Sequence, residues 1–205
     1  MLQKLANIVS VLLHPVWMPT YGLLILFGTP YMHSVTTPRQ RYLLLASVVF
    51  FTILIPLGFM MVRILRGKAS GLMLPDRNER RLPYFVTLLS YIMLEYLLVS
   101  LHIDPPIILV VIGFVVAITM MSCINIVWKI SAHMCGIGGL CGAFFAVSWL
   151  LYANNLPLMI GLILLSGILA WARLECRAHT AAQLAVGFIV GFSGGFLPLL
   201  IRMTL

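Results

Sequence analysis

Seven apolar runs, each about as long as a membrane-crossing helix, constrain the fold of this chain more than any other feature. A hydrocarbon core about 30 Å thick needs roughly 20 helical residues to cross it. A backbone in lipid must also satisfy its own hydrogen bonds, which a helix does. We therefore expect an all-α, polytopic transmembrane bundle of six or seven helices, with spans near residues 10–32, 42–64, 84–102, 106–128, 134–153, 156–172 and 180–202.

The composition excludes a soluble globular domain and a disordered chain. Hydrophobic residues make up 62% of the 205 residues and charged residues only 9%, against roughly 45–50% and 25% in soluble domains. We expect one integral-membrane domain over residues 1–205. Its first span, interrupted by His14, Pro15 and Pro19, is expected to be kinked or partly re-entrant and is the candidate for a position peripheral to any site.

The excess positive charge gathers on one face. The net charge is +8, but no soluble, aromatic-interleaved basic surface is present, so we expect a lipid bilayer and no nucleic acid as partner. If all seven spans cross, one face holds the N-terminus and the junctions 65–83, 129–133 and 173–179. That face carries ten of the thirteen basic residues: Lys4, Arg63, Arg66, Lys68, Arg77, Arg80, Arg81, Lys129, Arg173 and Arg177.

Two of these junctions combine a cation with a histidine at the start of a span. The later junction reads Arg173-x5-His179-x3-Gln183, and the spacing puts His179 and Gln183 on one helical face. The earlier junction, 129–133, places Lys129, Ser131 and His133 within five residues. Helix N-termini present unpaired amides and a partial positive charge, which suit a phosphate group.

These motifs resemble those of the type 2 phosphatidic acid phosphatase (PAP2) and haloperoxidase superfamily. That family has K-x6-R-P, P-S-G-H and S-R-x5-H-x3-D. Residues 131–133 are similar to the second motif, 173–179 to the third, and 68–83, with its Arg-Arg-Leu-Pro end, loosely to the first. The departures are Ile130 for Pro, Ala132 for Gly and Ala172 for Ser. The resemblance covers about the C-terminal two-thirds of the chain.

The resemblance implies a membrane-lipid phosphatase that uses no metal and no cofactor. His179 would attack phosphorus and form a phosphohistidine, while His133 would protonate the leaving oxygen. Arg173 would hold the phosphoryl oxygens. The substrate would be a phosphomonoester or diphosphate of a phospholipid or polyprenyl lipid. Further substrate-binding residues would be Lys129, Ser131, Arg80, Arg81, Arg77 and Lys68.

One departure keeps two other functions open. The family has Asp four residues after the nucleophilic His, and this chain has Gln183. An amide oxygen can fix the imidazole tautomer but carries no charge to stabilise the imidazolium. Glu175 would take over this orienting role if the backbone there were helical. The alternatives are a catalytically decayed lipid-phosphate binding or transport protein, and a lipid phosphoryl or head-group transferase.

The remaining histidines and cysteines predict no metal site, because no CxxC pair or zinc-type spacing occurs. We interpret His14, His33 and His102 as ordinary interfacial polar residues. Membrane orientation is ambiguous, since removing the seven suspected site cations leaves three basic residues on each face. The family resemblance implies a bacterial inner membrane with the site on the periplasmic side.

Overall fold

A computed structural model describes residues 1–150 and 155–204 of the chain, and the side chains through residue 201. The described part is helical, with no strand in it. Its elements are α1 Leu2–Leu12, η1 Pro15–Trp17, α2 Met18–Phe27, α3 Pro30–Val35, α4 Pro38–Val49, the π-helix η2 Phe50–Leu54, α5 Ile55–Leu65, η3 Asn78–Arg80, α6 Arg81–Ser100, α7 Pro105–Val127, α8 Ala132–Leu150, α9 Leu156–Glu175 and α10 Ala181–Thr204.

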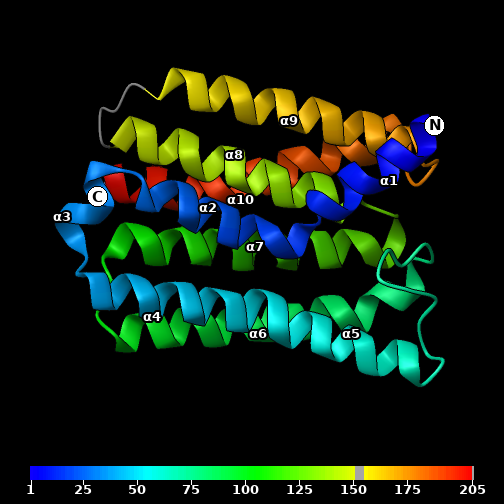
Figure 1. Cartoon of the computed structure of the whole chain (residues 1–205), viewed down its shortest axis with the longest axis horizontal. Coiled ribbons are helices and arrows are strands. Elements are labelled where there is room, and N and C mark those ends of the chain that lie inside the picture. The colour runs from blue at the N-terminus through cyan, green and yellow to red at the C-terminus, as the bar shows by residue number, and fades with distance from the viewer. Residues whose placement is uncertain (151–154, 205) are drawn as a thin grey trace.

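Seven helical stretches are long and apolar enough to cross a membrane, which confirms the predicted all-α transmembrane bundle and makes the chain a multi-pass membrane protein. They lie side by side along the long axis of the molecule (Figure 1). The last residues of the predicted span 134–153 fall outside the described residues. The stretches are Leu2–Phe27, Pro38–Leu65, Asn78–Ser100, Pro105–Val127, Ala132–Leu150, Leu156–Glu175 and Ala181–Ile201.

The first span differs from its predicted bounds, 10–32. It begins at Leu2 and ends at Phe27. Thr29 and Pro30 start the separate short helix α3, because the Thr29 hydroxyl accepts a hydrogen bond from Met32 N at 3.4 Å and caps it. The expected interruption is present: His14 has extended backbone (φ −67°, ψ 140°), as the residue before a proline prefers. This break separates α1 from α2.

The second span contains a π-helical turn at Phe50–Leu54. Pro56 follows and has no backbone N–H, so the carbonyl of Phe51, five residues earlier, lacks the donor that a π-turn would supply. The hydroxyl of Ser90 on α6 donates to that carbonyl. A side chain from the neighbouring helix thus satisfies a backbone group inside the membrane span, as the lipid environment requires.

Helix α8 forms the centre of the bundle. Of its span, 78% is buried, against at most 39% in any of the other six. Glycines allow α10 to pack directly on it: a methyl group at Gly138 or Gly142 of α8 would overlap the carbonyl of Phe188 or Phe192, and one at Gly191 or Gly195 of α10 would overlap the carbonyl of Cys135 or Gly139. Small residues at such contacts let backbones approach closely.

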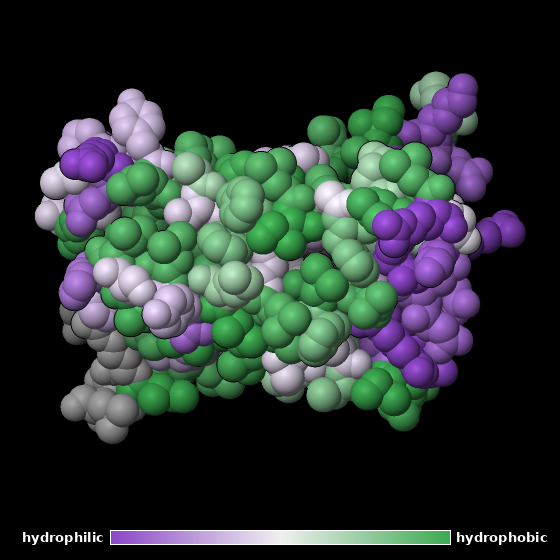
Figure 2. All heavy atoms as spheres, turned by 90° about the horizontal axis from the view of Figure 1, so that it is seen from below, coloured by the Kyte–Doolittle hydropathy of each residue, from purple (hydrophilic) through white to green (hydrophobic). Residues whose placement is uncertain are grey.

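Four polar segments gather at one end of the bundle. Figure 1 places the N-terminus, the loop between α5 and α6, the α7–α8 junction and the α9–α10 junction at the same end. Figure 2 shows a dense hydrophilic cap at that end and a largely hydrophobic surface along the middle of the molecule. The cationic junctions identified in the sequence therefore share one surface, beyond the apolar belt.

We predict that Gly191→Ala lowers the stability of the fold. The added methyl group would meet the backbone of Cys135, and overpacking of this kind costs about 1–3 kcal/mol. Gly161→Ala on α9 is the matched control, because nothing lies within 4 Å of its added carbon and alanine favours helix by about 1 kcal/mol. Thermal unfolding in detergent measures both, and equal unfolding temperatures would contradict the packing argument.

Candidate functional site

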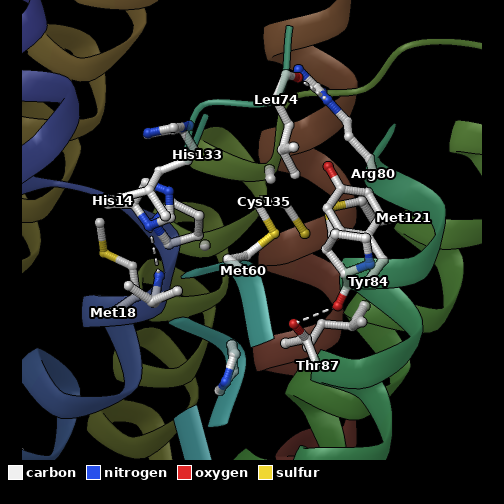
Figure 3. A pocket seen from close by; sticks show the side chains of 18 of the residues that line it. His14, Met18, Met60, Leu74, Arg80, Tyr84, Thr87, Met121, His133 and Cys135 are labelled. Atoms are coloured by element: carbon white, nitrogen blue, oxygen red, sulfur yellow. Dashed lines mark hydrogen bonds between the residues drawn. The ribbon is translucent and has the colours of Figure 1, made fainter. Parts of the chain in front are cut away.

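A cavity of about 150 Å³ lies where these junctions meet. Figure 3 shows it between the helices, with His14 and His133 on one side and Arg80 and Tyr84 on the other. Its polar lining consists mainly of cationic and imidazole side chains, and within the described part of the chain that lining contains no carboxylate. The five ionisable basic side chains are His14, Arg80, His133, Arg173 and His179.

Arg80 links two of the junctions. It lies at the end of η3 and is only 4% exposed. Its Nε donates to the Leu74 carbonyl at 2.7 Å and its Nη1 to the Ile130 carbonyl at 3.1 Å. Nearby, Asn125 donates to the Arg77 carbonyl at 3.1 Å. These bonds fix the loop before α6 against the α7–α8 junction and leave the charge of Arg80 at the cavity wall.

Arg173 reaches the cavity from the last turn of α9 and is also 4% exposed. Its Nε is buried and has no hydrogen-bond partner among the described residues. A cation removed from water without a partner is strongly unfavourable, and ionisable groups inside membrane proteins usually mark a functional site. Two buried guanidiniums beside one cavity without carboxylates therefore form a site suited to an anion.

His179 lies directly before α10, and Gln183 holds its orientation. The Nδ1 of His179 lies 3.1 Å from Gln183 Oε1, which also accepts from Thr180 N at 3.2 Å. A backbone N–H only donates, so the shared atom is oxygen and Nδ1 must carry the proton. The Nε2 of His179 is then unprotonated, with a lone pair available for reaction. This contact is the one that the His-x3-Gln spacing predicts.

The surroundings of His179 oppose its protonation. Burial and then the charge of Arg80 lower the pKa of its imidazole, with smaller contributions from Lys129 and Arg173, while the Gln183 hydrogen bond raises it; the net pKa is about 3. Burial together with Arg80 and Arg173 also lowers the pKa of Lys129. Four basic groups thus repel one another here, and a bound anion would relieve that repulsion.

His133 occupies the first turn of α8 and is 5% exposed. Its Nε2 lies 3.0 Å from the Ser10 carbonyl, which only accepts, so this nitrogen carries a proton. The ring of His14 packs edge-to-face on it, with centroids 5.1 Å apart. The first span is therefore not peripheral to the cavity, because its break places His14 and Pro15 in the lining.

Five of the six predicted substrate-binding residues do not line the cavity. Lys68 and Arg81 are exposed, and Arg77 is half-buried with its carbonyl bonded to Asn125. Ser131 is fully buried, and its hydroxyl caps α8 by accepting from Met134 N at 3.4 Å. Lys129 also lies outside the lining, half-buried, and acts on His179 through its charge.

The helical backbone that the orienting role of Glu175 requires is absent. Helix α9 ends at Glu175, and Arg177 has a left-handed φ of 48°. The chain therefore turns between Glu175 and His179, and helical spacing does not bring the two together. The imidazole interacts with Gln183 on the following helix instead.

Sequence analysis missed His14 and Tyr84. His14 was interpreted as an interfacial polar residue, yet it contacts His133 and lines the cavity. Its signal was the His-Pro pair that interrupts an apolar run. Tyr84 follows the Arg-Arg-Leu-Pro segment and faces the cavity beside Arg80 (Figure 3). The one sequence feature that could have predicted this location is that Tyr84 follows Arg80 by one helical turn.

No family model, no curated protein and no solved structure matches this chain. The resemblance to the PAP2 superfamily therefore rests on the three motifs, and the arguments below rest on the cavity.

We predict that Arg173→Met strongly weakens anion binding without destabilising the protein. The substitution removes a buried charge whose Nε has no described partner, and methionine is an apolar side chain of similar reach. Loss of a buried charged partner should weaken phosphate binding by about 2 kcal/mol, roughly thirtyfold. The measurement is the rise in unfolding temperature that inorganic phosphate produces.

Arg81→Met, at an exposed position, is the control and should keep the protection by phosphate. Arg80→Met should instead lower the unfolding temperature in buffer alone, because the Leu74 and Ile130 carbonyls lose their donor. Undiminished phosphate protection in Arg173→Met would contradict the assignment of an anion site.

Proposed function

We propose that this chain is a membrane-lipid phosphatase of PAP2 type. It would hydrolyse a phosphomonoester or diphosphate of a phospholipid or polyprenyl lipid through a phosphohistidine. The observation that carries the proposal is the unprotonated Nε2 of His179 at a cavity that also holds buried Arg80 and Arg173 and, in the described chain, no carboxylate. A neutral nitrogen nucleophile beside fixed cations is the arrangement that phosphoryl transfer needs.

In the first step the Nε2 lone pair of His179 forms a bond to phosphorus as the bond from phosphorus to the lipid oxygen breaks. The leaving oxygen takes a proton from His133. Because Nε2–H of His133 is held by the Ser10 carbonyl, that proton would come from Nδ1 of an imidazolium, a form that the charge of the bound phosphate would favour. Water then attacks phosphorus, gives its proton back to His133, and breaks the phosphorus–nitrogen bond to release phosphate.

The cations supply the electrostatic part of the reaction. Arg80 and Arg173 would hold the phosphoryl oxygens, and Lys129 would add charge from just outside the lining. Arg80 is fixed by two carbonyl acceptors, so it would need little reorganisation as negative charge redistributes. The proposed setting is a bacterial inner membrane with the site on the periplasmic side, as in the family that the motifs resemble.

A second candidate, lipid-phosphate binding or transport without turnover, is favoured by one observation. Gln183 is neutral where the family has a carboxylate, and the imidazolium of His179 is strongly disfavoured in the free site. Loss of such a carboxylate can cost orders of magnitude in rate. Phosphate release from a panel of phosphatidic acid, lysophosphatidic acid and polyprenyl phosphates distinguishes the two candidates. A transferase would form product only with an added acceptor alcohol.

We predict that His179→Gln abolishes phosphate release from every lipid phosphate that the wild type hydrolyses. The amide cannot form the phosphohistidine, so a loss of at least about 10³-fold is expected. The unfolding temperature should stay near that of the wild type, because His179 lies before the first residue of α10 and outside the packed helices. His102→Gln, at an isolated loop histidine, is the control. Normal turnover in His179→Gln would remove the mechanism, and activity should persist in EDTA.

We predict that Gln183→Asp moves the acid limb of kcat/KM toward neutral pH and raises the maximal rate. Activity needs neutral His179, so it is lost as the pH falls through the pKa of this group in the free enzyme. That pKa is about 3 in the wild type, so His179 imposes no limb above about pH 5. A carboxylate at residue 183 favours the imidazolium and raises the pKa.

The measurement is the difference between the two pH profiles, because ionisation of the substrate phosphate contributes equally to both. Coincident profiles would show that residue 183 does not act on the nucleophile.

A further inference from the structure

A second cavity, of about 50 Å³, lies deeper in the bundle. It is lined by residues of α2, α4, η2, α6, α7 and α8, and it shares the side chains of Pro19, Tyr91 and Phe114 with the first cavity. We call it the inner chamber. The three shared residues line both spaces, so the inner chamber adjoins the candidate site on the side toward the interior of the membrane span.

The two cavities follow one face of each flanking helix. On α6 the lining residues after Pro83 are Tyr84, Thr87, Tyr91, Leu94 and Leu98, at alternating steps of three and four. Such steps keep side chains on a single helical face. Thr87 and Tyr84 lie together beside the first cavity (Figure 3). On α7, Met121, Ile118, Phe114, Val111 and Ile107 follow the same steps in the opposite direction, and the adjacent Ala117 and Val110 also line the cavities.

Together the two adjoining cavities follow a long stretch of α6, which we call the path. From Tyr84 to Leu98 it extends about 21 Å at a helical rise of 1.5 Å per residue. One leaflet of a bilayer core is roughly 15 Å deep, so the path passes the midplane. A water molecule needs about 10–15 Å³ of such space, and the inner chamber therefore has room for the end of one hydrocarbon chain and not for two.

The lining of the inner chamber is mainly apolar, as a hydrocarbon tail requires. Its lining is aliphatic and aromatic apart from Thr52 and Tyr91. Basic residues line only the outer cavity, which holds Arg80, Arg173 and His179. One end of the path thus suits a phosphate and the other suits a hydrocarbon, and a path with such ends fits a lipid phosphate with its tail inside the protein.

We propose that the inner chamber binds the far end of one hydrocarbon tail of the lipid phosphate, and so selects for tail length. This inference rests on the proposed function for the identity of the head group. A second tail, where the lipid has one, would stay outside this path.

The test uses two substitutions that fill the inner chamber from different helices, Val48→Phe on α4 and Val110→Phe on α7, since both residues line it. Val116→Phe is the matched control: it makes the same change on α7 at a position that is 41% exposed. The probes are n-alkyl phosphonates of 4 to 16 carbons, which cannot be hydrolysed, and the matching alkyl phosphates, whose phosphate release is measured.

Both chamber-filling variants should bind the long phosphonates roughly tenfold more weakly than the wild type, since about fourfold is lost for each methylene group excluded. Their affinity for four-carbon phosphonate should equal that of the wild type, and Val116→Phe should change neither. Each ratio compares proteins at one chain length, so partition of the probe into detergent cancels. Wild-type affinity for long chains in both filled variants would overturn the proposal.

The two readouts separate this proposal from the function on which it rests. Tail-length-dependent phosphonate binding that the filled variants lose, without phosphate release from any alkyl phosphate, would support the inner chamber and overturn the phosphatase. Phosphate release with the same kcat/KM at every chain length, in the wild type and the filled variants alike, would overturn the inner chamber alone.

Discussion

The close packing of α8 against α10 is the contact on which the rest of the structure depends. Glycines on both helices leave no room for a side chain between the backbones, so the relative position of the two helices is set by backbone contact rather than by adaptable side chains. His133 lies in the first turn of α8, and His179 lies just before α10. Packing that buries α8 at the centre therefore also brings the two histidines to one cavity, although 46 residues separate them.

The basic side chains of the site lie close together although their charges repel one another, and backbone carbonyls hold Arg80 in place. Burial, Arg80 and Arg173 lower the pKa of Lys129, and burial together with Arg80, Lys129 and Arg173 lowers that of His179. The cavity lining offers no carboxylate in the described chain. The fold holds Arg80 with two carbonyl oxygens that carry only partial charge. The favourable packing of α8 on α10 thus offsets the repulsion among these unneutralised cations. Such an arrangement is expected when a bound ligand supplies the missing negative charge.

Hydrophobic run length predicted the all-α bundle and six of the seven spans closely, because the bilayer imposes a fixed length on any apolar helix. The spacing Arg173-x5-His179-x3-Gln183 likewise placed three side chains, since all three lie at the ends of two consecutive helices. The sequence could not show which of two adjacent basic residues enters the cavity. Arg80 is buried and Arg81 exposed, because the Leu74 and Ile130 carbonyls hold Arg80, and the sequence pattern does not show these contacts. His14 depends on how α1 packs on α9 and on the α8 end, and no local pattern specifies that.

Helix α8 connects the two ends of the proposed lipid path. Its first turn carries His133, and the same helix lines the inner chamber with Leu140, Ala143, Phe144 and Val147. Helix α8 is one continuous helix, and α10 packs along its length. The distance between the His133 imidazole and the inner chamber is therefore fixed by the helix. A tail seated in the chamber would therefore set how far its phosphate reaches toward His179. In such a site, binding of the tail would affect the reaction by positioning the phosphate relative to His179. The glycine contacts that hold α8 in place would therefore contribute to substrate recognition.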